Sequence, residues 1–244
     1  MKTILIVEDN DLYFDAAKST ITQNTLDRAI DYCDAMKKIT GEKYDGAIID
    51  CFFPEETGTN KTDLGKSLVA RLQGEDPHER KMAEGMEILK DHINLEYPEI
   101  YKLARYLVDS LPDFKNSVIN QALKSVGELS KEVSTLAFRN TVELIYRENR
   151  APKDYYGDLF RAIDNSEANQ PLGILVAEKA AELHHPLVLA TSTYHHDSLT
   201  QPIQNYASTK GWKLIDCAPN KENDKETPEY WVRVMRELER LLSK

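Results

Sequence analysis

Three short apolar runs, each followed by a polar residue, are the feature that most restricts how this chain can fold. These runs are Ile4–Val7 before Glu8 and Asp9, 47–49 before Asp50, and 187–190 before Thr191. Uninterrupted aliphatic runs of this length are typical of strands that are buried on both faces, as in parallel sheets. The pattern therefore predicts an α/β protein built around a parallel sheet.

Weaker strand patterns and helical patterns fill the sequence between these runs. Thr25–Ile30 contains two charged residues and is predicted to be an edge strand, and Lys213–Ile215 is predicted to be a further short strand. The segment Pro228–Leu242 has an apolar stripe at helical spacing. Strands that alternate with helices imply right-handed βα units. We therefore predict a doubly wound sheet of five parallel strands in the order 2-1-3-4-5.

The middle of the chain interrupts this alternation. Asp50 and Pro186 lie much farther apart in the sequence than the roughly 30 residues of a βαβ unit require. The sequence between them carries helical patterns punctuated by prolines and no convincing strand pattern. We therefore predict a discontinuous α/β domain formed by residues 1–59 and 171–244. Residues 60–170 are predicted to form an all-helical insertion between the third and fourth strands.

Composition narrows the class of protein further. The chain of 244 residues has a formal net charge of −10, which argues against the basic footprint of a nucleic-acid-binding protein. Its three cysteines, an odd number, do not indicate a disulfide scaffold. No apolar run approaches the roughly 18 residues of a membrane span. We expect a soluble, cytoplasmic protein without nucleic-acid or membrane partners.

The polar residues at the strand ends are the best candidates for chemistry. The carboxyl ends of parallel strands meet at one edge of a sheet, where α/β proteins bind their ligands. If the three strands are neighbours, Glu8, Asp9 and Asp50 converge there, with Thr191 and Ser192 beside them. Clustered carboxylates repel one another and bind hard cations, so the pattern predicts a Mg²⁺ site with these three acids as ligands. Each of these side chains also has a plainer interpretation as a helix cap.

Two histidine pairs form a weaker metal pattern. His184-His185 and His195-His196 lack the i, i+4 spacing of helical metal sites, and no cysteine lies at ligand spacing from them. The second pair follows the predicted fourth strand and can therefore line the same pocket as the acids. The sequence does not favour a transition-metal site.

The segments around the acids have a characteristic order and internal spacing. Residues 4–10 combine a strand with an acidic pair, and residues 44–50 end a second strand on an aspartate. Pro54 and Gly58 follow that aspartate, and residues 186–192 form a strand that ends on hydroxyl groups. In this order the segments resemble the receiver domain of two-component response regulators. The resemblance covers about residues 2–58 and 171–244 and leaves out the helical middle of the chain.

The resemblance implies a flavodoxin-like fold and a role for each strand-end residue. Asp50 takes the place of the phosphoryl acceptor, and Thr191 takes the place of the hydroxyl that contacts the phosphoryl group. Glu8, Asp9 and Asp50 take the place of the Mg²⁺ ligands. The implied partner is a histidine kinase or a phosphotransfer protein that donates the phosphoryl group.

Two positions depart from the family's pattern. The family has a lysine, followed by a proline, after the fifth strand, and Gly211 and Pro219 align that position with Ala218. The family's aromatic switch residue, three positions earlier, corresponds to Ile215. The retained acids favour a receiver that accepts phosphoryl groups. The two departures favour a pseudo-receiver, which is a protein-interaction module without phosphotransfer.

A third interpretation is a Mg²⁺-dependent phosphohydrolase with the insertion as a cap. A nucleophilic aspartate after a strand fits it, but such hydrolases carry a second aspartate two residues later, where this chain has Phe52.

In the receiver interpretation the insertion begins close to Asp50 and acts as a regulatory or output surface toward a protein effector. The alternative is a static insertion that fixes a homodimer.

Overall fold

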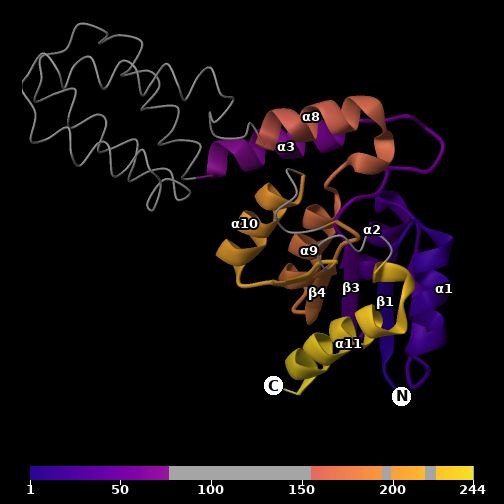
Figure 1. Cartoon of the computed structure of the whole chain (residues 1–244). Helices are drawn as coiled ribbons and strands as arrows, with labels where there is room; N and C mark the ends of the chain where they lie inside the picture. Colours follow the sequence, from indigo (N-terminus) through magenta and orange to yellow (C-terminus); the bar gives the residue numbers. More distant parts are fainter. Residues whose placement is uncertain (77–154, 194–198, 218–223, 244) are drawn as a thin grey trace, which may run out of the picture. The chain divides into compact units, whose positions relative to one another are not determined.

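A five-stranded parallel sheet forms the core of the protein (Figure 1). The structure is a computed structural model that describes residues 1–76, 155–193, 199–217 and 224–243. The strand order is β2-β1-β3-β4-β5, which confirms the predicted doubly wound, flavodoxin-like topology and places the charged strand β2 at an edge. The strands are β1 (Thr3–Val7), β2 (Thr25–Ala29), β3 (Gly46–Asp50), β4 (Leu187–Ala190) and β5 (Lys213–Ile215).

The central strands bury side chains on both faces of the sheet, as their uninterrupted apolar sequences predict. Ile6 of β1 lies opposite Ile48 of β3, which lies opposite Val188 of β4, and all three belong to one apolar core. Their neighbours in the chain, such as Leu5 and Ile49, belong to a second core on the other face. Alternation along each strand therefore divides the aliphatic side chains between two layers.

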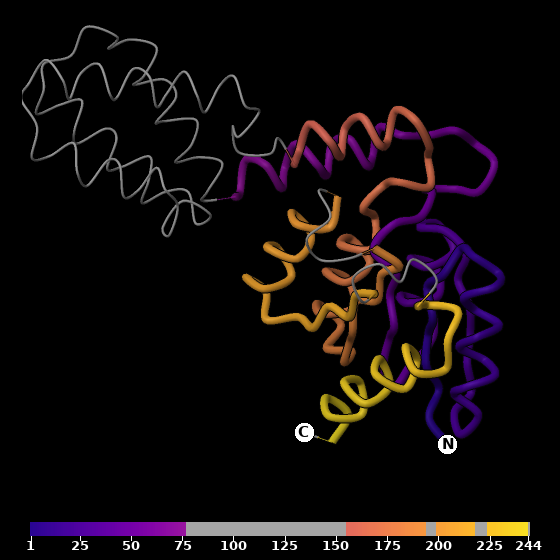
Figure 2. Tube along the Cα trace, viewed as in Figure 1, coloured from indigo at the N-terminus to yellow at the C-terminus, as the bar shows by residue number. Residues whose placement is uncertain are grey.

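Helices cover both faces of the sheet (Figures 1 and 2). One face is covered by α1 (Asp11–Thr20) and α11 (Pro228–Leu242). The other is covered by α2 (Tyr32–Gly41), α9 (Gly173–Glu182) and α10 (Thr200–Lys210). The predicted final helix agrees with α11, whose buried stripe packs against β1, β3 and β4.

Polar side chains cap the N-termini of α1, α2 and α11, close to the carboxyl ends of the strands. The side chain of Asn10 accepts hydrogen bonds from the first turn of α1, and that of Asp31 accepts one from the first turn of α2. Thr227 caps α11 in the same way. Gly211, with a φ of 71°, ends α10 in the left-handed conformation that glycine adopts without strain. Because Asn10 and Asp31 follow their strands so closely, the loops after β1 and β2 are short.

Two helices of the predicted insertion belong to the sheet unit. α3 (Asp63–Glu75) and α8 (Tyr155–Asn165) lie side by side, joined by an ion pair of 2.5 Å between Lys66 Nζ and Asp164 Oδ1 (Figure 1). Leu68 and Leu159 are buried in the same apolar core as α9. The chain divides into one compact unit of residues 1–72 and 155–244 and a second of residues 73–154. The domain boundaries therefore differ from the predicted 60–170, because apolar side chains at both ends of that segment pack on the sheet unit.

The remaining helices predicted for the insertion fall in residues 77–154, outside the described residues. Within the described part of the chain, no strand between β3 and β4 joins the sheet.

The chain returns from the insertion beside the strand that it left. The Phe53 amide donates to the Gln170 carbonyl at 3.2 Å, and the Gly173 amide donates to the Cys51 carbonyl at 3.2 Å. The buried side chain of Gln170 also accepts a hydrogen bond of 3.1 Å from the Gly65 amide at the start of α3. The returning segment is therefore tied to the loop after Asp50 by backbone hydrogen bonds and to the start of α3 by the side chain of Gln170.

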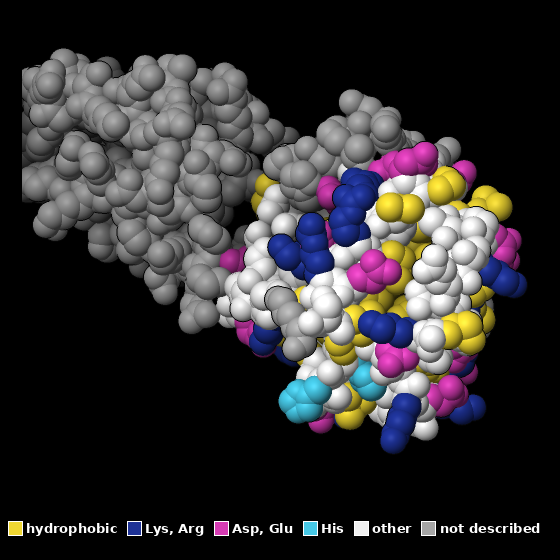
Figure 3. Space-filling view, turned by 90° about the horizontal axis from the view of Figure 1, so that it is seen from below, with side chains coloured by type: hydrophobic (Ala, Val, Ile, Leu, Met, Phe, Trp, Pro, Cys, Tyr) yellow, Lys and Arg dark blue, Asp and Glu magenta, His cyan; other side chains and the backbone are white. Residues whose placement is uncertain are grey.

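The face seen from below in Figure 3 carries mixed charge among the described residues. Basic and acidic side chains are interspersed on this face, with apolar side chains between them.

Among the described residues, no helix is both long enough and apolar enough to cross a membrane.

Candidate functional site

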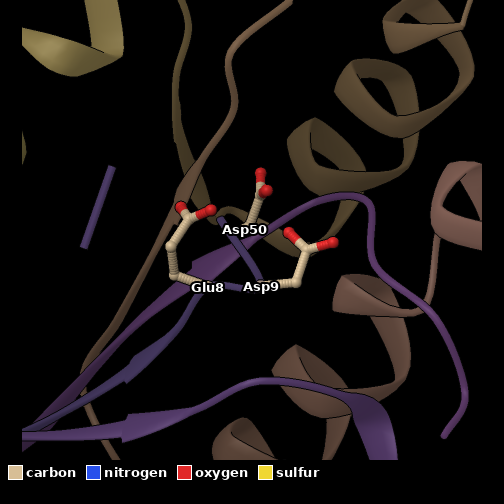
Figure 4. A group of neighbouring side chains, drawn as sticks. All are labelled: Glu8, Asp9 and Asp50. Atoms are coloured by element: carbon tan, nitrogen blue, oxygen red, sulfur yellow. The ribbon is translucent and has the colours of Figure 1, made fainter. Parts of the chain in front are cut away.

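Three carboxylates meet at the carboxyl edge of the sheet (Figure 4). Glu8 and Asp9 follow β1, and Asp50 is the last residue of β3, which pairs with β1. One carboxylate oxygen from each acid lies within 4.8 Å of those of the other two. Glu8 and Asp50 are buried, and Asp9 is partly buried. A buried group of three carboxylates at this spacing can hold a metal ion.

Hydrogen bonds to the backbone fix the loop that carries two of these acids. Arg28 of β2 donates from Nε to the Glu8 carbonyl at 2.8 Å and from Nη2 to the Asp9 carbonyl at 2.9 Å. Its Nη1 forms an ion pair of 2.6 Å with Asp11. The Asn10 amide donates to Glu8 Oε1 at 3.1 Å. The first strand therefore ends in a rigid loop, held by a charged residue of the edge strand.

A buried lysine faces the carboxylates. Lys225 belongs to η3 (Asp224–Glu226), a short 3-10 turn just before α11. Its Nζ lies 2.6 Å from Glu8 Oε2 and 3.1 Å from Asp50 Oδ1. The ammonium group also lies 5.3 Å from the centroid of the Tyr13 ring. Glu8 Oε2 makes no well-directed hydrogen bond, so charge rather than hydrogen-bond geometry holds this pair.

Lys225 lies at the acid site, where the sequence analysis expected no lysine. The sequence comparison placed Ala218 at the family's lysine position, and Ala218 lies outside the described residues. The structure brings Lys225 to Glu8 and Asp50, so the acid site contains a lysine that the sequence analysis did not predict. The sequence analysis missed Lys225 because it looked for a lysine beside Pro219, close to β5. The one sequence signal for Lys225 was its position just before the final helix, at the end of the sheet where the acids converge.

Burial and mutual charge set the pKa values at this site. Loss of solvent raises the pKa of Glu8 well above its usual range, against the attraction of Lys225. Burial and then repulsion from Asp50 raise the pKa of Asp9 to about 6. Burial also raises the pKa of Asp50. For Lys225 burial lowers the pKa, but the attraction of Asp50 and Glu8 outweighs it and the pKa rises. The lysine therefore stays charged, whereas the acids hold protons more readily than exposed acids do.

Thr191 follows β4 directly and is fully buried. The strand register pairs Asp50 with Ala190, so Thr191 lies one residue beyond the level of Asp50. Its Oγ1 lies 2.9 Å from Oγ1 of Thr193, and either hydroxyl can be the donor. The structure thus places Thr191 at the end of the neighbouring strand, with its hydroxyl paired to a second threonine.

A tyrosine of α11 contacts the residue that sequence reasoning aligned with the family's aromatic switch. The hydroxyl of Tyr230 lies 3.0 Å from the carbonyl oxygen of Ile215 and 3.0 Å from that of Thr191. Tyr230 is fully buried. The aromatic group next to Thr191 therefore comes from the final helix rather than from β5. Tyr230 lies far from β5 in the sequence, so an alignment based on β5 could not identify it.

The histidine pairs and Ser192 do not join the acids among the described residues. His184 and His185 precede β4 and so belong to the opposite edge of the sheet. The pair at 195 and 196 lies outside the described residues. Ser192 is partly exposed next to Thr191.

The charge of the described site matches a divalent cation. When all three carboxylates are ionised, they and the one ammonium group leave two negative charges, which a divalent cation would neutralise. The edge of the sheet also has the geometry at which α/β proteins bind phosphorylated ligands. No family model, curated protein or solved structure matches this chain. The geometry of the site is therefore the basis for a proposed function.

Proposed function

We propose that this protein is a receiver-like signalling protein that accepts a phosphoryl group on Asp50 with the help of Mg²⁺. The observation that carries the proposal is the contact of Lys225 with both Asp50 and Glu8 at the carboxyl edge of a parallel sheet. A carboxylate can act as the nucleophile for a phosphoryl group, and a nearby ammonium group and a metal ion held by acids can stabilise the charge on the phosphoryl oxygens. Glu8, Asp9 and Asp50 would hold the Mg²⁺, which would neutralise charge on the phosphoryl oxygens.

The residues of the chain have separate tasks in this reaction. A carboxylate oxygen of Asp50 attacks the phosphorus atom, and the bond between phosphorus and the donor nitrogen breaks. The electron pair stays on the donor imidazole, which takes up a proton from solvent. The ammonium group of Lys225 lies where it can neutralise a phosphoryl oxygen on Asp50. A histidine kinase or a phosphotransfer protein would supply the phosphohistidine.

A separate observation weighs against each of the two alternatives. The pseudo-receiver interpretation rested on Ala218 and Ile215, and the contact of Lys225 with Asp50 weakens the first of these two arguments. A phosphohydrolase with a helical cap would need a second acid two residues after its nucleophile. Phe52 occupies that position, so the proposal retains phosphoryl acceptance without rapid hydrolysis.

Phosphorylation with a small donor tests the proposal directly. Incubation with acetyl phosphate and Mg²⁺ is expected to add one phosphoryl group, measured by intact-protein mass spectrometry. Asp50→Asn should abolish the adduct because it removes the nucleophile, and chelation of Mg²⁺ should do the same. Asp15→Asn, at an exposed position on α1, is the matched control and should leave the adduct unchanged. An adduct that persists in Asp50→Asn, or none in the wild-type protein, would refute the proposal.

A further inference from the structure

The turn that carries Lys225 is held by side chains of α11. The indole N–H of Trp231 donates to the carbonyl of Lys225, with Nε1 and O 2.8 Å apart, and both residues are fully buried. Arg233 donates from Nη2 to Asp224 Oδ2 at 2.5 Å. The hydroxyl of Thr227 donates to the Asp224 carbonyl at 2.6 Å. The residue before the lysine and the lysine itself are therefore both fixed by the helix that follows them.

These contacts matter because the turn has little order of its own. η3 has only three residues, and a single 3-10 turn contributes few hydrogen bonds. Lysine carries its charge on a long, flexible stem, so the position of the ammonium group depends on how firmly the backbone is held. The bond from Trp231 is a buried contact on the carbonyl of Lys225 itself, so it holds the backbone from which the lysine side chain extends.

We propose that Trp231 is a positioning residue for the acid site. Its indole N–H fixes the backbone at Lys225, so that the ammonium group reaches an anion bound at Asp50, and Arg233 supports the same turn through Asp224. This inference rests on the proposed function and extends it. On this inference α11, rather than β5, fixes the position of the Lys225 ammonium group relative to Asp50.

Binding of beryllofluoride, a phosphoryl mimic, tests this role at saturating Mg²⁺. Trp231→Phe keeps a buried aromatic ring but lacks the N–H, and it should weaken beryllofluoride binding roughly three- to tenfold, as loss of one neutral hydrogen bond does. In a Lys225→Ala background the same substitution should have no further effect, because there is no ammonium group left to position. Equal weakening in both backgrounds would show a general structural role and overturn the proposal.

A second variant leaves the core intact. Arg233→Gln removes the charged contact with Asp224 from a partly exposed position, and it should weaken beryllofluoride binding in the same Lys225-dependent way. Arg236→Gln, at an exposed position on the same helix, is the matched control and should leave binding unchanged. Equal effects of the two arginine substitutions would contradict the assigned role of the turn.

Unfolding in urea separates this inference from the proposed function. If the wild-type protein binds no beryllofluoride, the proposed function fails, but the positioning role can still be measured. Trp231→Phe and Lys225→Met should then shift the urea midpoint by less together than the sum of their separate shifts, because Trp231 stabilises the ion pairs of the lysine. Additive shifts would overturn the positioning role.

Discussion

At the scale of single residues, the site depends on charged groups that are kept out of water. Glu8 and Asp50 are buried beside Lys225, where a lone carboxylate would be strongly unfavourable. One ammonium group does not balance three carboxylates, so protons or a cation must supply the remaining positive charge. The raised pKa values of Glu8 and Asp9 express this need. The protonation of the acids and the binding of a cation are therefore competing events.

This competition predicts how stability depends on pH without divalent cations. An acid whose pKa is higher in the folded state holds its proton more tightly there, so it stabilises the fold at low pH, and this contribution is lost as pH rises. The loss should begin near the unfolded-state pKa of these acids, about 4, and it should be complete for Asp9 at its folded-state pKa of about 6 and for Glu8 at its higher pKa. Urea midpoints measured between about pH 5 and about pH 8 should fall accordingly, and Mg²⁺ should restore stability mainly at the higher pH.

Glu8→Gln provides the comparison for this prediction. The amide cannot ionise, so the variant should lose less stability than the wild-type protein as pH rises. It should also gain less from Mg²⁺, because one ligand is gone. A pH dependence identical to that of the wild-type protein would show that Glu8 does not titrate in this range.

At the scale of elements, the start of α9 lies against the backbone at the end of β3. A Cβ atom on Gly173 would lie 2.0 Å from the carbonyl oxygen of Asp50 and 2.9 Å from the Cα of Cys51. Both contacts are with backbone, which cannot turn aside as the end of a flexible side chain can. Glycine is therefore required at Gly173 for the helix to approach Asp50 this closely.

Gly173→Ala is expected to destabilise the protein by about 3 kcal/mol or more, because either α9 or the end of β3 must move. The urea midpoint of unfolding measures this loss. Gly74→Ala is the matched control, since a Cβ there meets nothing within 4 Å. This control should be neutral or stabilising by up to about 1 kcal/mol, as for glycine replaced in an exposed helix. Similar losses in both variants would contradict the importance of the close contact.

At the scale of the whole molecule, the candidate phosphoryl acceptor is connected to both ends of the long insertion. The loop after Asp50 bonds through Phe53 to Gln170, and Gln170 bonds to Gly65 in α3. A change at Asp50 would therefore act first on segments that lead into and out of residues 73–154. On the proposed function, we expect a regulatory or output role for the insertion, and a static insertion that fixes a homodimer is the alternative.

Hydrogen exchange can distinguish these two roles. Addition of Mg²⁺ and beryllofluoride should change amide protection in residues 51–54, 61–65 and 167–173, because their hydrogen bonds join the acid site to the insertion. The Asp50→Asn variant, treated in the same way, should show no change in these segments. Changes confined to β5 and α11 in the wild-type protein would favour the static insertion.

Local sequence determined the sheet and the convergence of the acids. The aliphatic runs before Glu8, Asp50 and Thr191 specify buried strands, because burial on both faces requires apolar residues at every position. Two charged residues in Thr25–Ile30 specify an edge strand for a similar reason. The order of helices and strands then brings the carboxyl ends of β1 and β3 together. The buried strands and the edge strand depend on the composition of short segments, so they can be predicted without the tertiary structure.

Only the tertiary structure decided which residues complete the site. Lys225 reaches Asp50 from a turn that has no strand or motif to mark it, and Tyr230 reaches Thr191 from a helix. α3 and α8 join the sheet unit because Leu68 and Leu159 share its apolar core, although a helical pattern alone does not say against what a helix packs. Each of these contacts joins residues far apart in the chain. Their partners are set by the packing of whole elements, which no local pattern specifies.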